Sequence, residues 1–186
     1  MIDVPLAHRS IGADEVSVAS ESRDGDVVLT MGAGSIGAAA ADNQDWPKHF
    51  RLAKAMRKSS VEYRHCNIYD MSPYNVGTFD LVFCGSVLIH LRDQLLALER
   101  IAGLVREGGT FVSAEAYYTR AGRLPLAIAR YRADRPKDVV FWEPNPRAWR
   151  RMLWTAGFDE VREHGRFKLE ARAGWAVPHV VHHARR

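Results

Sequence analysis

The chain has 186 residues, 47% of them hydrophobic and 26% charged, which is the composition of a folded globular domain and not of a disordered or fibrous chain. It has no long apolar stretch, and residues 1–30 are acidic and lack the form of a signal peptide, so we expect one cytoplasmic domain without a membrane partner. The net charge of +4 is uneven: residues 1–100 hold 10 Lys and Arg against 13 Asp and Glu, whereas residues 101–186 hold 16 against 9, which suits either an anionic partner or a solvated arginine-rich surface.

The first predicted element is a strand at Val27–Thr30 that leads into a glycine loop, Gly32-Ala33-Gly34-Ser35-Ile36-Gly37. A G-x-G-x-x-G loop of this kind lets the backbone approach a nucleotide closely. A helix, a second strand and an acidic residue for the ribose should follow, but the chain reaches "DNQDWP" soon after the loop. We therefore expect residues 1–45 to be an atypical glycine-loop segment that lacks the usual second strand.

Three more strands are predicted from short runs rich in β-branched and aromatic residues, at Val61–Cys66, Phe79–Cys84 and Thr110–Ala114. Two of these runs are nearly continuously apolar, which is typical of parallel strands that are covered on both faces. Cys66 and Cys84 each end a run, and we expect both thiols to be buried and reduced.

The clearest predicted helix has apolar residues at helical spacing from Leu91 to Val105, and Gly108 and Gly109 are expected to stop it. A less regular helix is expected over Pro47–Lys58. These helices alternate with the strands, as they do in a doubly wound sheet.

Near the carboxyl terminus, a helix is predicted to begin at Pro146 behind a capping Asn145 and to end at Gly157. Three antiparallel edge strands are expected beyond it, at Asp159–His164, Arg166–Arg172 and Ala176–Ala184. The whole pattern predicts a doubly wound α/β fold with a mostly parallel sheet and a ligand at the carboxyl ends of its strands.

The stretch from Trp46 to Ala173 resembles class I S-adenosylmethionine-dependent methyltransferases. The resemblance rests on ordered blocks: "CNIYD", "FDLVFCGSVLIHL", an amphipathic helix, "REGG" with a strand, and "WRRMLWTAGFDEV". Within this class the blocks are most similar to the tRNA wobble-uridine (carboxy)methyltransferase-like group. The resemblance implies a Rossmann-like methyltransferase fold, S-adenosylmethionine as cofactor, and an acceptor that is either RNA (such as tRNA) or an anionic small molecule.

The resemblance also implies a site for the methyl donor. Asn67 and the backbone of Ile68 would meet the adenine edge, while the loop Gly85–Val87 would flank the methionine part of the donor. Ordinary turn chemistry after a strand is the alternative for these polar residues. The full implied set is Gly32, Gly34, Asn67, Ile68, Tyr69, Asp70, Gly85, Ser86 and Val87.

Several positions depart from the class. Thr30 stands where an acidic residue usually precedes the first glycine, and Ile89 stands where the carboxymethyl-transferring group has a tyrosine. Because Ile89 offers no hydrogen bond to a carboxylated donor, we expect plain S-adenosylmethionine to be used. The segment "RDGDVVLTMGAGSIG" also resembles a carboxyl-terminal segment of Mur ligases, although the chain has no ATP-binding G-K-[ST] loop.

Acceptor residues are predicted in two places. His90 follows "SVLI", where this class brings residues to the rim of the active site, and it is the candidate base; packing beneath the following helix is the alternative. Residues 116–137 interleave aromatic and cationic side chains, as expected for an RNA-binding segment or a lid over a small molecule. The candidate substrate residues there are Tyr118, Arg120, Arg123, Arg130 and Tyr131.

The remaining alternatives concern metal binding and other functions. His179, His182 and His183 have metal-like spacing but no acidic or thiol residue nearby in sequence, so we expect no metal. A degenerate member that binds a nucleotide or RNA without catalysis would explain the departures from the class. A nicotinamide-dependent oxidoreductase would use the same glycines but would leave the later blocks unexplained.

Overall fold

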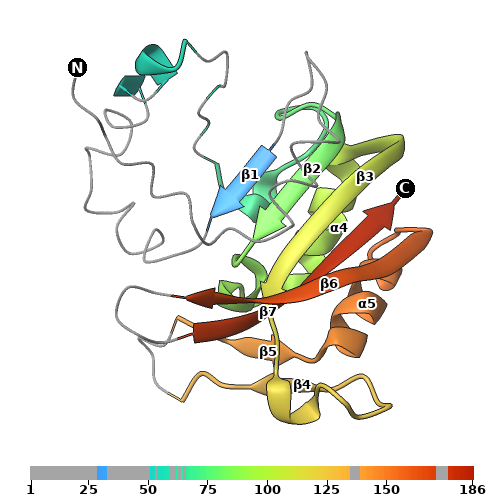
Figure 1. Ribbon diagram of the computed structural model, residues 1–186. Helices are drawn as coiled ribbons and strands as arrows, with labels where there is room; N and C mark the ends of the chain where they lie inside the picture. Colours follow the sequence, from blue (N-terminus) through green and yellow to red (C-terminus); the bar gives the residue numbers. More distant parts are fainter. Residues whose placement is uncertain are drawn as a thin grey trace.

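The computed structural model describes residues 29–32, 51–52, 54–58, 62, 64, 66–134, 139–170 and 176–186 (Figure 1). At its centre is a five-stranded sheet of order β1-β2-β3-β7-β6. The strands are β1 (Leu29–Gly32), β2 (Phe79–Gly85), β3 (Val105–Ala116), β6 (Glu160–Glu170) and β7 (Ala176–Arg185). The first three are parallel, whereas β7 runs antiparallel to both β3 and β6. The predicted α/β class and the antiparallel carboxyl-terminal strands are thus confirmed.

The carboxyl ends of the parallel strands lie at one edge of this sheet. Gly32 of β1 is paired with Gly85 of β2, which is in turn paired with Ala114 of β3. Ligands of open α/β sheets bind at this edge, where the strands end and the loops begin. The sheet register therefore places the loop after β2 at the centre of the expected binding edge.

The described fold also contains two α-helices with defined bounds, three short 3₁₀ helices, a small second sheet, and a helical stretch at residues 51–52 and 54–56. Their bounds are α4 (Gln94–Leu104), α5 (Pro146–Thr155), η1 (Ile68–Asp70), η2 (Leu88–His90), η3 (Thr119–Ala121), β4 (Ala129–Tyr131) and β5 (Trp142–Pro144). Side chains of α4 and α5 share one core with β2, β3 and β7, in which Phe111 stacks on Phe158 at 5.4 Å between ring centroids. In Figure 1, β4 and β5 lie below the main sheet, next to α5.

The helix α4 differs from its prediction at both ends. It begins at Gln94 because the Asp93 carboxylate caps it, accepting a hydrogen bond from the Leu96 amide at 2.9 Å. It ends at Leu104, and Val105 is already paired with Phe79 in the sheet. Gly108 and Gly109 therefore do not stop the helix, and that prediction was wrong.

Gly108 and Gly109 instead permit a register shift between β2 and β3. Gly108 has φ +77°, a conformation that residues with a side chain rarely adopt. A Cβ on Gly109 would lie 2.9 Å from the Arg106 carbonyl oxygen. The pair permits the irregular start of β3, where the partners shift between Phe79 and Leu81.

The prediction for α5 is confirmed. The Asn145 side chain accepts a hydrogen bond from the Ala148 amide, Pro146 occupies the first turn, and Gly157 has φ +104°. The three strands expected beyond Phe158 are in fact two long ones, because β6 continues through a register shift between Glu163 and Gly165. Of the two, β7 is not an edge strand but lies between β3 and β6.

The predicted strand at Val61–Cys66 is not found in the described part of that run. Glu62, Arg64 and Cys66 are exposed and irregular, and Arg64 contacts the Asn75 carbonyl and Glu62 rather than a strand. The prediction of two buried thiols holds for Cys84 but is wrong for Cys66, which is exposed.

Predictions for the first sixty residues are tested only in part. The first strand is confirmed as β1, and the described residues at 51–52 and 54–56 are helical as expected. Gly34 and residues 38–46, where the missing strand was sought, lie outside the described residues. Across the described ranges, no helix is both long and apolar enough to cross a membrane.

Candidate functional site

The loop after β2 lies at the carboxyl edge of the sheet and is held in an unusual backbone conformation. Ser86 has φ +55°, and its amide donates a hydrogen bond to the Ala114 carbonyl of β3 at 2.9 Å. A Cβ on Gly85 would lie 2.8 Å from the Phe83 ring, so a side chain fits there only if that ring moves. The glycine therefore makes room for the Phe83 ring, and the strained Ser86 backbone lies at the edge where ligands of such sheets bind.

Glu115 of β3 fixes the position of this loop through hydrogen bonds. Its carboxylate is 1% exposed and accepts hydrogen bonds from the amides of Val87 at 3.1 Å and Leu88 at 3.2 Å, with the Cys84 sulfur 3.7 Å away. Burial raises the pKa of Glu115 to about 7, although these hydrogen bonds oppose the rise. Glu115 was not predicted from the sequence, where the available signal is a carboxylate between Ala114 and Ala116 at the end of a predicted buried strand.

Ser86 and His179 form a hydrogen-bonded pair at the same edge. The Ser86 hydroxyl lies 2.7 Å from His179 Nε2, and His179 Nδ1 lies 2.9 Å from the Val177 carbonyl. A carbonyl can only accept, so Nδ1 carries the proton and Nε2 accepts from the hydroxyl. Burial lowers the pKa of His179, which is therefore neutral at pH 7. The arrangement can pass a proton from the serine to the imidazole.

His90, the predicted base, lies in η2 beyond this loop. Its Nδ1 donates to the Val139 carbonyl at 2.6 Å, while the Phe141 amide donates to the Ile89 carbonyl at 2.9 Å. These bonds fasten η2 to the segment before β5. They orient the imidazole and leave Nε2 as an acceptor, so the ring is positioned but is not paired with a carboxylate in the described structure.

The predicted adenine-binding residues are grouped around η1. The Asn67 side-chain oxygen caps η1 by accepting from the Tyr69 amide at 3.1 Å, and the Tyr69 hydroxyl accepts from the Asp93 amide at 3.1 Å. Ile68 packs in the same core as Val87, whereas Asp70 is exposed. Asn67 thus has the turn role of the alternative interpretation, but its amide nitrogen stays available for a ligand.

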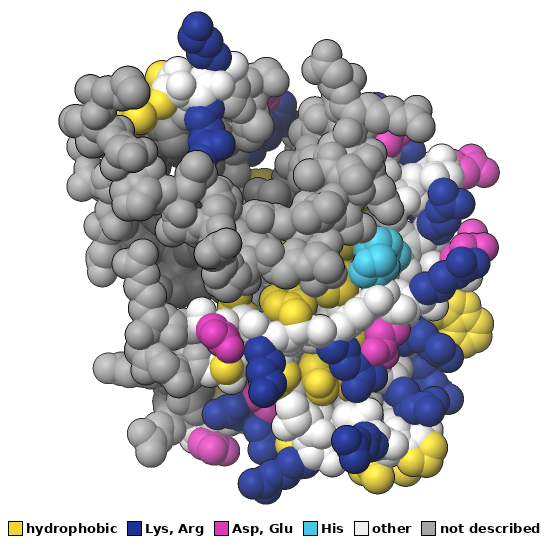
Figure 2. Space-filling view, viewed as in Figure 1, with side chains coloured by type: hydrophobic (Ala, Val, Ile, Leu, Met, Phe, Trp, Pro, Cys, Tyr) yellow, Lys and Arg dark blue, Asp and Glu magenta, His cyan; other side chains and the backbone are white. Residues whose placement is uncertain are grey.

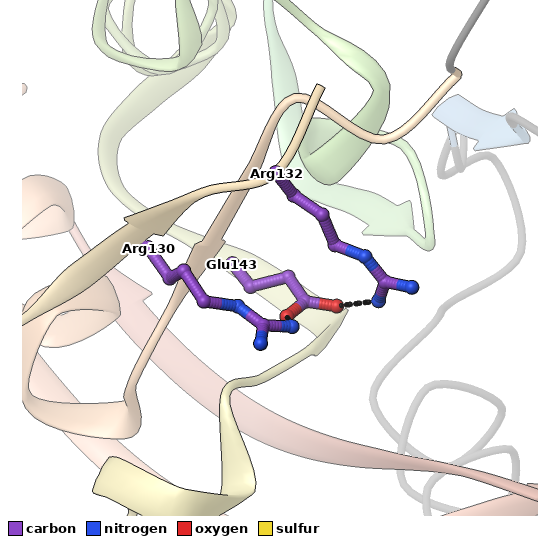
Figure 3. Close-up of polar contacts among 3 residues, drawn as sticks. All are labelled: Arg130, Arg132 and Glu143. Atoms are coloured by element: carbon purple, nitrogen blue, oxygen red, sulfur yellow. Dashed lines mark hydrogen bonds and ion pairs between the residues drawn. The ribbon is translucent and has the colours of Figure 1, made fainter. Parts of the chain in front are cut away.

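The predicted substrate segment contains an ion-pair cluster. Arg130 of β4 and Arg132 both reach the carboxylate of Glu143 in β5, one to each oxygen (Figure 3). The Arg130 guanidinium also lies over the Tyr118 ring, 4.5 Å from its centroid. Arg130, one of the predicted substrate residues, is therefore already paired with a carboxylate.

The other predicted substrate residues lie outside this cluster. Arg120 and Arg123 are exposed around η3. Tyr131 is 56% exposed and packs edge-on against Trp142, with ring centroids 4.9 Å apart. The exposed face here is therefore both aromatic and cationic.

The alternation of β7 places His182 on one face of the sheet and His179 and His183 on the other. His179 contacts Ser86, His183 stacks on His164 at 4.4 Å, and His182 is buried with a pKa lowered to about 4 by desolvation. Within the described ranges, no group of three metal-binding side chains is found.

Comparison with known proteins agrees with this geometry. Residues 34–113 match the family described as a methyltransferase domain. Ubiquinone biosynthesis O-methyltransferase of Xanthomonas campestris pv. campestris is 30% identical over 79 residues, which are 42% of this chain and 31% of that protein. The match therefore spans about a third of the length of this curated relative.

Solved structures share the fold at low identity. The N-terminal domain of EvdMO1, crystallised with S-adenosylhomocysteine (SAH) and D-fucose, aligns with a TM-score of 0.62 at 17% identity and covers 96% of this chain and 84% of that one. The YcgJ protein of Bacillus subtilis aligns with a TM-score of 0.63 at 12% identity and covers 93% and 97%. The fold is that of class I S-adenosylmethionine-dependent methyltransferases. The resemblances to the tRNA wobble-uridine group and to Mur ligases remain predictions.

The residues at the carboxyl edge fit S-adenosylmethionine as the cofactor of such a domain. The Ser86 backbone is held in a left-handed conformation at the strand end by the Ala114 carbonyl, and the Asn67 side chain is exposed beside η1. Both features suit a ligand that lies across the strand ends and hydrogen-bonds through a base edge.

Proposed function

We propose that this protein transfers a methyl group from S-adenosylmethionine to an acceptor that must lose a proton, and that the acceptor is a small anionic molecule. The observation that carries the proposal is the hydrogen bond between His179 and Ser86, a residue of the loop that would hold the donor. When bound, the cofactor would supply an electrophilic methyl group on a positively charged sulfur. Asn67, Ile68 and the loop Gly85–Val87 would hold it.

The proton path follows from the hydrogen-bond directions. An acceptor hydroxyl that donates to Ser86 Oγ would lose its proton to that oxygen, while the serine hydroxyl gives its own proton to His179 Nε2. A neutral imidazole is needed for this step, and the lowered pKa of His179 keeps the ring neutral at pH 7. The acceptor oxygen, held by Ser86 as its proton leaves, would then be the nucleophile for the methyl group that the bound donor supplies. His90 would orient the acceptor from the other side of the loop.

The ion-pair cluster of β4 and β5 favours a small acceptor over RNA. Glu143 pairs with both Arg130 and Arg132, so the predicted lid presents less free positive charge than its sequence indicated. An unpaired RNA loop binds chiefly through cations on its phosphates and aromatic rings on its bases. The O-methyl transfer named for the Xanthomonas relative supports a hydroxyl acceptor.

Donor binding tests the proposal directly. Calorimetric titration with S-adenosylmethionine, SAH and NAD should show binding of the first two and none of NAD. Gly85→Val should weaken donor binding at least about tenfold, because its side chain would meet the Phe83 ring and force the loop that would hold the donor to shift. Binding of NAD alone would support the oxidoreductase instead. Donor binding without turnover on a panel of phenols, hydroxy acids and RNA would support a non-catalytic member.

The choice of donor is a second test. Ile89 is 8% exposed and apolar, so it cannot pair with the extra carboxylate of a carboxylated donor. We expect S-adenosylmethionine to bind more tightly than its carboxylated analogue in a competition titration. Tighter binding of the analogue would contradict this choice and would indicate that arginines of the predicted lid pair with the carboxylate.

A further inference from the structure

A cavity of about 400 Å³ lies beside α5, and it is lined by three segments. The turn after η3 contributes Gly122 and Arg123, the first turns of α5 contribute three residues, and β6 contributes two. The complete lining is Gly122, Arg123, Pro146, Arg147, Arg150, Glu163 and Arg166. Of the residues predicted to bind donor or acceptor, this lining includes Arg123 alone.

The charges of the lining do not balance. Glu163 is fully used by Arg166, whose Nε and Nη2 donate to its two oxygens at 2.6 and 3.0 Å. This bidentate pair lowers the pKa of Glu163, which is therefore ionised at neutral pH. Among the ion pairs of the described residues, none includes Arg123, Arg147 or Arg150. The cavity thus holds three positive charges in excess.

The position of Arg166 is set by its neighbours. Its guanidinium lies between the Glu163 carboxylate and the Tyr117 ring, 5.4 Å from the ring centroid. Arg147 and Arg150 belong to a helix whose cap, Asn145, is fully buried. Part of the cationic wall is therefore preorganised, which reduces the entropy lost when a ligand binds.

This cavity differs from the paired arginines of β4 and β5. There, one carboxylate meets two guanidinium groups and one positive charge is left over (Figure 3). Figure 2 shows Lys and Arg side chains gathered over the lower part of the molecule, where Figure 1 places β4, β5 and α5. Arginines from three separate segments converge on one cavity, which is a stronger signal than surface charge alone.

We propose that this cavity binds a phosphate group carried by a ligand. A phosphate presents several acceptor oxygens and up to two negative charges, which guanidinium groups meet with paired hydrogen bonds. The amino-terminal end of α5 adds the positive end of a helix dipole. The phosphate comes either from a phosphorylated small molecule or from the backbone of an RNA. The inference does not depend on methyl transfer, because phosphate binding is measured without a methyl donor.

The test compares three proteins by calorimetry at low ionic strength: wild type, Arg147→Ala/Arg150→Ala and Arg151→Ala. Arg151 is the matched control, because it is an exposed arginine of the same helix that does not line the cavity. The probes are inorganic phosphate, a nucleoside 5′-monophosphate and a short single-stranded RNA. Thermal unfolding checks that each variant is folded, and Arg123→Ala on the exposed turn replaces the double variant if that one is not.

We expect inorganic phosphate and the monophosphate to bind wild type and to bind the double variant about tenfold or more weakly. The Arg151→Ala protein should match wild type. Tighter binding of RNA, with the same loss in the double variant, would assign the phosphate to an RNA backbone. No binding of any probe to wild type, or an equal loss in the Arg151→Ala control, would overturn the proposal.

Discussion

At the scale of single residues, Asn67 combines a structural role with a proposed role in donor binding. Its side-chain oxygen caps η1, and its amide nitrogen is the group that would reach the adenine edge. Substitution by alanine would remove both at once. A useful variant must therefore separate the cap from the donor contact.

We predict that Asn67→Asp unfolds at nearly the wild-type temperature but binds S-adenosylmethionine about tenfold more weakly. The aspartate keeps the capping oxygen and loses the amide N–H groups, and one hydrogen bond contributes about 1 kcal/mol. Asn67→Ala should in addition lower the free energy of unfolding by about 1 kcal/mol. Calorimetry and urea titration measure the two effects. Wild-type affinity in the aspartate variant would exclude Asn67 from the donor site.

At the scale of elements, Asn145 joins α5 to the segment that precedes β4. It is fully buried, and all four of its side-chain hydrogen bonds are made. Its oxygen accepts from Ala148 and Ile128, and its nitrogen donates to the carbonyls of Ala121 and Leu126. One side chain therefore caps a helix and holds a turn of the predicted lid.

We predict that Asn145→Ala lowers the free energy of unfolding by about 2–4 kcal/mol, because the cap is lost and buried polar groups lose their partners. Urea unfolding measures this change. Arg151→Ala on the same helix should shift stability by less than about 0.5 kcal/mol. A loss of only about 1 kcal/mol in Asn145→Ala would show that the cap alone matters and that the turn is held by other contacts.

The elements also show how far the sequence could predict the structure. The bounds of α5 follow from Asn145, Pro146 and Gly157, because capping and helix termination are local. The end of α4 does not, since Val105 leaves the helix to pair with Phe79 across the sheet.

The candidate site, too, is predicted in part by local sequence and in part only by contacts between distant residues. The glycine and serine after β2 are visible as a motif. The partner of Ser86 lies 93 residues away, at a position where the sequence pattern indicated only metal-like spacing. Such a contact depends on the order of strands in the sheet, which no local pattern records.

At the scale of the whole molecule, two buried groups make the free energy of unfolding depend on pH in opposite directions. Glu115 has its pKa raised to about 7, so the folded state favours the protonated carboxyl. The free energy of unfolding that Glu115 contributes therefore falls as pH rises from 4.5 to about 7. His182 has its pKa lowered to about 4, so its contribution is lost as pH falls from 6.5 towards 4. Between pH 4.5 and 6.5 the two changes partly offset each other.

We predict that Glu115→Gln makes the free energy of unfolding rise more steeply between pH 5 and 6.5 than it does in wild type. The variant lacks the group whose contribution falls, and the difference accumulates to the order of 3 kcal/mol by pH 7. Urea unfolding at several pH values measures the slope. His182→Asn should change the slope in the opposite direction. Parallel profiles for wild type and Glu115→Gln would contradict the raised pKa.

The place of β7 in the sheet sets an order of assembly during synthesis. β6 leaves the ribosome before β7, yet among the described strands it is joined to the sheet through β7, which lies between it and β3. Until β7 emerges, the nascent chain carries an unpaired edge on β3 and a strand with no partner. Open strand edges are the surfaces through which unfinished chains associate. Chains in which β7 has not yet paired would thus be exposed to aggregation, and chaperones that shield unpaired β-strands would raise the yield of folded protein.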